Sequence, residues 1–291
     1  MSTINTSIDI CEKLPRGIVP LYRAIDEATT ALGIRYLVVG AMARDLVLVY
    51  GFNAGIERGT RDVDFGIQVN SWEDFQTLKD ALLNQGFTED EKSGEQRLIG
   101  PDKWDLSLDS LDLVPFGGIQ DDNANISWPP NKDMVMSVLG FDEALRTAMK
   151  VTISRDPLLV IPVASLPGIT LLKLIAWTDR AADKKAKDAQ DLRFIMLNYI
   201  KIQEISDLIY TEGVMDKYDY DADLASAHIL GKHAGEIATV ATRNQIGKIF
   251  ADDIAGRTQE NLILDMSPSK LTAPDHAEDF LRAFWEGFDS A

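Results

Sequence analysis

Cysteine and histidine are nearly absent from this sequence. Its 291 residues include one cysteine, Cys11, and three histidines. A single thiol cannot form a disulfide within the chain, and so few cysteine and histidine ligands argue against a zinc site. We therefore expect any bound metal to be held by oxygen atoms.

Long apolar runs are missing too. No segment approaches the roughly 20 apolar residues that cross a bilayer, and the first residues lack the basic start and apolar stretch of a secretion signal. We expect a cytoplasmic protein with no membrane contact. The composition, 45% hydrophobic and 26% charged, is rich enough in apolar residues for a core and excludes a wholly disordered chain.

Positive charge is in short supply. There are 29 Lys and Arg residues against 46 Asp and Glu residues, which gives a net charge of -17. This balance argues against broad, non-specific nucleic-acid binding, which requires cations at the phosphates. Two stretches reverse the sign, residues 35–61 and 173–201. They are either ordinary solvated surfaces or the walls of a locally basic cleft in an acidic protein.

The hydrophobic periodicity predicts strands mixed with helices up to residue 164 and only helices beyond it. Strands are expected at 36–39, 62–69, 109–118, 134–140 and 158–164, with helices at 18–32, 41–50, 71–86 and 141–149, loops at 119–132 and 257–274, and a last helix at 278–288. We predict an α+β fold of two domains. Residues 1–164 would form a mixed β-sheet core with flanking helices, and 165–291 a helical C-terminal domain.

Three aspartates are the strongest candidates for catalysis. Side chains alternate along a strand, so Asp62 and Asp64 share one face, and Asp112 lies on the polar face of a later strand, whereas Asp109 falls on the other face. Neighbouring carboxylates repel each other unless a cation is shared, and Mg²⁺ binds carboxylates together with phosphate oxygens. The trio predicts two Mg²⁺ ions at a phosphoryl- or nucleotidyl-transfer site. The alternative is the exposed face of an edge strand.

A small-residue turn precedes these carboxylates. Gly40 and Ala41 connect a predicted strand to a predicted helix, and the free backbone N–H groups of such a turn can cradle a triphosphate. Arg44 and Arg61 are candidate phosphate contacts nearby. The alternatives are a simple tight connection and two surface arginines.

These residues resemble a known family. The Gly40-Ala41 turn, the pair Asp62-x-Asp64 and the later Asp112 are similar to the core of the nucleotidyltransferase superfamily with the DNA polymerase β-like fold, most of all to its AbiEii-like type IV toxin–antitoxin branch. The resemblance spans roughly residues 34 to 200. Two departures are Ala41, where the family usually has Gly or Ser, and the long interval from the turn to Asp62.

The resemblance adds a second motif and implies an activity. Its helical domain carries a lysine and a Lys-Asp-x-x-Asp segment, which match Lys173 and the residues Lys187, Asp188 and Asp191 as further nucleotide-binding candidates. It implies Mg²⁺-dependent transfer of NMP from an NTP to an acceptor hydroxyl, with a tRNA 3′ end or a protein as acceptor, toxicity linked to abortive infection, and an antitoxin partner.

The second motif is also unusual on physical grounds. Lys173 lies in a helix that is apolar on nearly all sides, so it either extends to the surface or faces a phosphate in a cleft. Asp188 continues the apolar stripe of the next helix through Leu192. It either lines an interface or compensates the dipole of a first helical turn.

Two other functions remain open at this stage. The protein could be a non-catalytic relative that binds nucleotide, RNA or a partner protein, or it could modify a small molecule of the aminoglycoside type. The three aspartates favour an enzyme, because a binding protein has no need of three carboxylates on one face.

Overall fold

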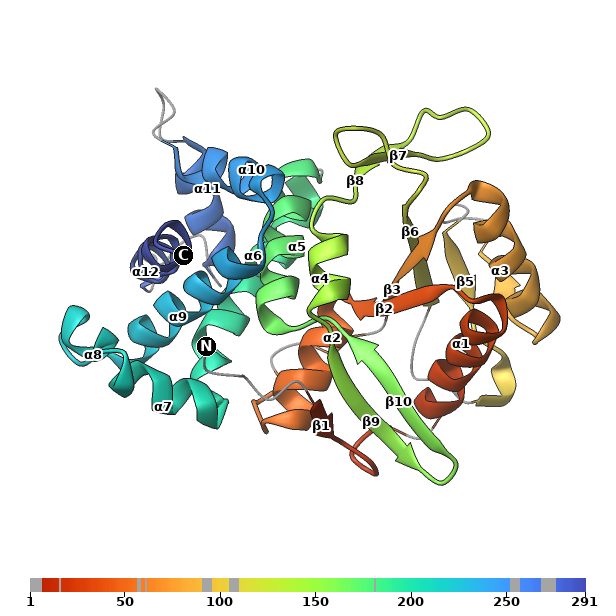
Figure 1. Cartoon of the computed structure of the whole chain (residues 1–291), viewed down its shortest axis with the longest axis horizontal. Helices are drawn as coiled ribbons and strands as arrows, with labels where there is room; N and C mark the ends of the chain where they lie inside the picture. Colours follow the sequence, from red (N-terminus) through yellow and green to blue (C-terminus); the bar gives the residue numbers. More distant parts are fainter. Residues whose placement is uncertain are drawn as a thin grey trace. The chain divides into compact units, whose positions relative to one another are not determined.

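The computed structural model describes residues 7–15, 17–56, 59–60, 62–90, 96–104, 110–180, 182–251, 257–267 and 276–291 (Figure 1). Two compact units are present. The sheet unit consists of Thr6–Gly51 and Gly55–Ala164, and the helical unit consists mainly of Ser165–Ala291 together with Phe52–Ala54. The sequence places a boundary at the same residue but assigns all of 1–164 to the first domain.

The sheet unit is built on an eight-stranded mixed sheet with the order β1-β9-β10-β2-β3-β6-β5-β4. Its strands are β1 (Ser7–Asp9), β2 (Arg35–Val39), β3 (Asp62–Val69), β4 (Thr88–Glu89), β5 (Arg97–Ile99), β6 (Ser110–Gly117), β9 (Met149–Arg155) and β10 (Leu158–Val163). A separate two-stranded sheet pairs β7 (Asn125–Ser127) with β8 (Val135–Ser137). With the helices described below, this confirms the predicted α+β class.

Alternation along the central strand explains the two faces of the sheet. On β3, Val63, Phe65 and Ile67 are fully buried, whereas Asp62 and Asp64 on the opposite face are half-buried. The buried face carries α1 (Ile18–Leu32), where the Tyr22 ring meets the Phe65 ring edge-on with centroids 5.9 Å apart. The apolar core thus fixes β3, and β3 in turn holds its carboxylates on the other face.

The remaining helices of the sheet unit agree with the predictions except in detail. They are α2 (Gly40–Asp45), a π-helical segment over Leu46–Gly51, α3 (Trp72–Asn84) and α4 (Phe141–Arg146), with a short 3-10 turn at Asp102–Trp104. Ser71 caps α3 by accepting a hydrogen bond from the backbone of Asp74. The single helix predicted over 41–50 is instead an α-helix that widens into a π-helix.

Two predictions in this unit are wrong. The helix predicted to run to residue 149 ends at Arg146, and β9 follows it, pairing antiparallel with β10 and parallel with β1. Residues 149, 151 and 153 of β9 are buried apolar side chains, so the alternation of a strand was present in the sequence. The loop predicted over 119–132 contains β7, which is only three residues long.

The helical unit contains α5 (Leu166–Asp179), α6 (Ala182–Asn198), a 3-10 turn at Tyr199–Lys201, α7 (Gln203–Thr211), α8 (Val214–Lys217), α9 (Ala222–Ile237), α10 (Val240–Phe250), α11 (Arg257–Met266) and α12 (Ala277–Asp289). The helix α11 lies where a loop was predicted over 257–274, and residues 268–274 of that prediction are outside the described residues. In the described part of the chain, no helix is long and apolar enough to span a membrane.

Close packing of α9 against α12 forms much of the core of the helical unit. A Cβ on Gly231 would collide with the backbone oxygen of Phe284, and a Cβ on Gly287 would collide with the backbone oxygen of His228. Glycine at both positions lets the two helix backbones approach more closely than side chains would permit.

Candidate active site

Three carboxylates share one face of two neighbouring strands. Strands β3 and β6 run parallel, with Asp64 paired to Asp112 and Asp62 paired to Ser110. Paired residues of a ladder point to the same side of the sheet, so the structure brings Asp62, Asp64 and Asp112 onto one face, each of them half-buried. Their catalytic and metal-binding roles remain predictions.

The strand-to-helix turn lies directly beside Asp64. Val39, the last residue of β2, pairs with Asp64, and Gly40 then begins α2 with a φ of 71°. A Cβ on Gly40 would overlap the Asp64 carboxylate. Glycine is therefore required here both by the backbone angle and by the approach of the carboxylate. Ala41 follows in the first turn of the helix.

An arginine that sequence reasoning missed holds the third carboxylate. Arg97 on β5 lies opposite Asp112 and binds it with both ends of its guanidinium group, Nε to Oδ1 at 2.8 Å and Nη2 to Oδ2 at 2.7 Å. The hydrogen bonds that Arg97 donates to Asp112 raise the pKa of Arg97, and the charge of Asp62 adds to this effect. Strand β5 is only three residues long, so its periodicity is too short to place Arg97 on this face.

A serine also missing from the predictions orients Asp62. The hydroxyl of Ser110 donates a hydrogen bond of 2.8 Å to Oδ1 of Asp62. The alternation that selected Asp112 also puts Ser110, two residues earlier, on the same face. The face on which Ser110 lies could therefore have been predicted from the sequence, whereas its contact with Asp62 depends on the register of β3 and β6.

The carboxylates fit a hard cation only in part. Asp62 and Asp64 offer the oxygen donors that Mg²⁺ prefers. Both oxygens of Asp112 accept hydrogen bonds from Arg97. Among the residues that the structure describes, no three His, Cys, Asp or Glu side chains are gathered closely enough to hold one ion. The donor chemistry fits at Asp62 and Asp64, whereas Asp112 is held by an arginine.

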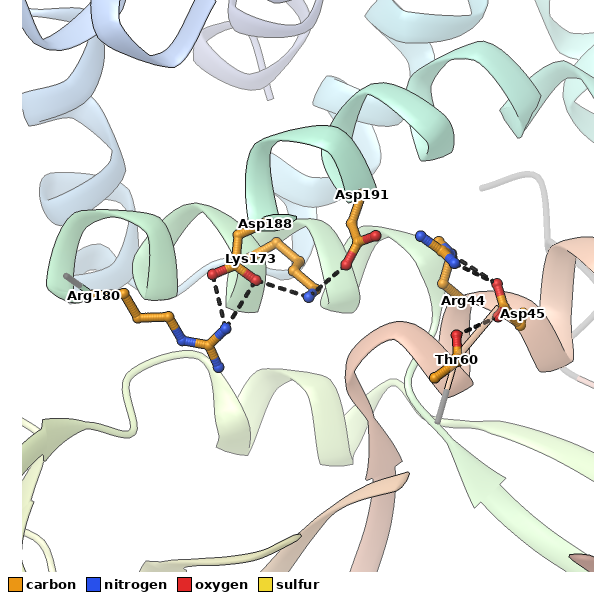
Figure 2. A network of polar contacts seen from close by, with 7 residues as sticks. All are labelled: Arg44, Asp45, Thr60, Lys173, Arg180, Asp188 and Asp191. Carbon is orange, nitrogen blue, oxygen red and sulfur yellow. Dashed lines mark hydrogen bonds and ion pairs between the residues drawn. The ribbon is translucent and has the colours of Figure 1, made fainter. Parts of the chain in front are cut away.

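Two arginines of the sheet unit were predicted to contact phosphate. One of them is buried, and the other lies outside the described residues. Arg44 is 2% exposed, so it is not a surface arginine, and it donates hydrogen bonds of 2.9 and 2.7 Å to Oδ1 of Asp45. Thr60 donates to the other oxygen of Asp45 at 2.6 Å (Figure 2). The phosphate contact of Arg44 remains a prediction, and Arg61 lies outside the described residues.

A second polar cluster lies in the helical unit. The Lys173 ammonium on α5 contacts Oδ1 of Asp188 at 2.8 Å and Oδ2 of Asp191 at 2.7 Å, both on α6 (Figure 2). Arg180, the residue after α5, donates to Asp188 at 2.9 Å. Both carboxylates are only 1% exposed. We call these four residues the buried ion cluster.

The cluster decides between the alternatives for its members. Lys173 does not extend to the surface, because its ammonium lies between two buried carboxylates. Asp188 does not compensate a first helical turn, because α6 begins at Ala182. Arg180 was missed because it lies just beyond the end of α5, where its backbone is extended and helical spacing no longer applies. Lys187 is exposed.

Opposing effects determine the protonation of Lys173. Burial lowers the pKa of the ammonium, but the charges of Asp191 and Asp188 and their hydrogen bonds outweigh burial, so the pKa is raised. Lys173 therefore remains a cation. It keeps the two buried carboxylates from repelling each other.

Comparison with known proteins places the chain in a family. Residues 23–255 match the nucleotidyl transferase AbiEii toxin family of type IV toxin–antitoxin systems. A comparison with curated proteins gives no match. Two similar solved structures are an antigenic nucleotidyltransferase-like protein from Paracoccidioides brasiliensis (16% identity, TM-score 0.40, 72% of this chain and 93% of that one) and the antibiotic-resistance factor ANT(2'')-Ia (13%, 0.34, 70% and 97%). The family match covers well over half of the sequence, and the chain therefore belongs to the AbiEii nucleotidyltransferase toxin family.

Proposed function

We propose that this nucleotidyltransferase uses Mg²⁺ to transfer NMP from an NTP to an acceptor hydroxyl, with release of pyrophosphate. The observation that carries the proposal is the gathering of Asp62, Asp64 and Asp112 on one face, beside the turn at Gly40. Oxygen ligands and backbone N–H donors together are what a metal-bound triphosphate requires.

Each candidate site residue of the sheet unit has a proposed role. Asp62, oriented by Ser110, and Asp64 hold the metal. Bound Mg²⁺ would supply the charge that offsets the triphosphate and favours ionisation of the attacking hydroxyl. Asp112 completes the metal site and helps to accept the proton of that hydroxyl. The turn at Gly40 and Ala41 offers backbone N–H groups to the phosphate oxygens, assisted by Arg44 and Arg61.

The helical unit is proposed to contribute to nucleotide binding through its own cations. An ammonium has three donors, and the contacts to Asp188 and Asp191 use two of them. The third donor of Lys173 can therefore bind a phosphate oxygen without breaking the buried ion cluster. Asp188 and Asp191 fix the position of Lys173, and the exposed Lys187 supplies a further charge.

Membership of the family supports a proposal for the acceptor and the partner. We propose a tRNA 3′ end or a protein hydroxyl as acceptor, toxicity with a role in abortive infection, and control by an antitoxin. The net charge of -17 supports an enzyme that binds one RNA end locally rather than one that coats itself in nucleic acid.

Incubation with labelled nucleotides tests the proposal. The purified protein is mixed with each labelled NTP, Mg²⁺ and either total RNA, total protein or an aminoglycoside. Product should form with the wild type and with Asp122→Asn, an exposed control, and should be lost in Asp64→Asn. The labelled fraction identifies the acceptor, and labelling of the aminoglycoside alone supports the small-molecule alternative. No product, or equal activity of Asp64→Asn, refutes the catalytic proposal.

A further inference from the structure

Arg97 is positioned where a divalent cation would bind Asp112. The register aligns Val39, Asp64, Asp112 and Arg97 in one transverse row across four adjacent strands. Each oxygen of Asp112 accepts one hydrogen bond from the guanidinium group, at 2.8 and 2.7 Å. A divalent cation that binds the oxygens of Asp112 would therefore encounter the positive charge of the Arg97 guanidinium group.

Loss of a proton from Arg97 cannot release its pairing with Asp112. A guanidinium group stays charged at every physiological pH, so Asp112 is freed only when the Arg97 side chain moves. Movement is feasible because 28% of the Arg97 side chain is exposed, compared with 18% for Asp112. The β5 strand that carries Arg97 is three residues long and pairs with the two-residue strand β4 at the edge of the sheet.

The pairing of Arg97 with Asp112 reduces the repulsion among the three carboxylates. Three carboxylates on one face of two strands repel one another, and Arg97 contributes a positive charge bound directly to Asp112. Its charge also acts on Asp62. Without metal, Arg97 therefore stabilises the arrangement that metal binding requires.

We propose that Arg97 is a positioning residue that acts as the built-in counter-ion of Asp112 and competes with divalent cations for it. Metal binds first through Asp62 and Asp64, and Asp112 joins only when Arg97 is displaced. This inference rests on the proposed function in one respect, that these carboxylates are the metal site.

Binding of Mn²⁺ without nucleotide tests the competition. Free Mn²⁺ is counted by electron paramagnetic resonance as it is titrated into the full-length protein. Arg97→Met should bind Mn²⁺ at least about tenfold more tightly than the wild type, since a unit charge a few ångströms away is removed. Arg97→Gln keeps a donor for Asp112 without the charge and should show a similar gain, which protects the test if Arg97→Met folds poorly.

Two controls separate competition from other effects. Arg35→Met removes an exposed arginine of the same unit and should leave the affinity unchanged. Adding Asp112→Asn to Arg97→Met should abolish the gain, because the contested carboxylate is gone. The proposal is overturned by unchanged affinity in both Arg97 variants, by an equal gain in Arg35→Met, by a gain that persists with Asp112→Asn, or by no Mn²⁺ binding in any protein.

The outcome is distinguishable from failure of the proposed function. If no nucleotide is transferred but the Arg97 variants bind Mn²⁺ more tightly, the transferase proposal fails and the role of Arg97 stands. If transfer occurs but the affinities are equal, the role of Arg97 fails by itself.

Discussion

Replacing Lys173 by methionine should destabilise the helical unit strongly. Methionine fills a similar volume, so the main change is the loss of the ammonium between Asp188 and Asp191, each of them 1% exposed. Removing one partner of a buried ion pair costs about 3–5 kcal/mol, because a buried charge loses its counter-charge. Arg180 still contacts Asp188, so we expect about 3 kcal/mol. At about 2–4 °C per kcal/mol, the melting temperature should fall by about 6–12 °C.

Urea unfolding followed by far-UV circular dichroism measures this loss. Lys187→Met makes the same substitution at an exposed position of α6 and should change the free energy of unfolding by less than about 0.5 kcal/mol. Adding Asp191→Asn to Lys173→Met should restore about 1–2 kcal/mol, since a neutral amide needs no counter-charge. A loss below about 1 kcal/mol in Lys173→Met, or a double variant less stable than the single one, would refute the reasoning.

The pH dependence of this stabilisation has a definite sign. The pKa of Lys173 is raised in the folded protein. The stabilisation is therefore complete below the ordinary lysine pKa and is lost only as the pH rises through the folded-state pKa.

Nucleotide transfer by the double variant Lys173→Met with Asp191→Asn separates the structural role of Lys173 from its proposed role in nucleotide binding. Restored activity would mean that the lysine is structural only.

Three further predictions concern the sheet unit. Gly40→Ala should lose about 2 kcal/mol of stability and most of its transferase activity, because it strains a positive φ and displaces a carboxylate; a fully active variant contradicts this. Ser110→Ala should weaken Mn²⁺ binding about tenfold by releasing Asp62, as measured by titration, and unchanged binding would count against that contact. Hydrogen bonds from Arg155 hold the pKa of Asp9 at about 2. Stabilisation by this pair is therefore complete above the ordinary aspartate pKa of 3.8 and is lost as the pH falls through the folded-state pKa of about 2. An NMR titration of Arg155→Met should show the pKa of Asp9 raised toward its usual range, and an unchanged pKa would contradict this assignment.

The common direction of two of the proposed catalytic carboxylates could be predicted from the sequence because it depends on local alternation. Asp62 and Asp64 are two residues apart on a strand with a buried opposite face, so their common direction follows from the pleat. Alternation also selected Asp112 on a later strand, but the pairing of that strand with β3 cannot be derived from periodicity. Strand order is a property of the whole sheet, and no local pattern determines it.

The partners of the charged residues could not be predicted from the sequence. Arg97 meets Asp112 only because β5 pairs with β6 in one particular register, and a shift by one residue would turn Arg97 to the other face. The hydrophobic pattern showed that Lys173 should be buried, but its carboxylate partners depend on how α5 packs against α6. Burial can be predicted from the hydrophobic pattern of a helix, whereas the pairing of buried charges depends on the tertiary contacts.

The transverse row of Val39, Asp64, Asp112 and Arg97 also has a consequence for the order of folding. Arg97 and Asp112 are 15 residues apart in the chain, whereas Ser110 and Asp62, which join β6 to β3, are 48 residues apart. Contacts between residues close in sequence form sooner, because less chain entropy is lost. We therefore expect β5 and β6 to pair before β6 pairs with β3, so that Asp112 already has its counter-charge when the carboxylate face assembles.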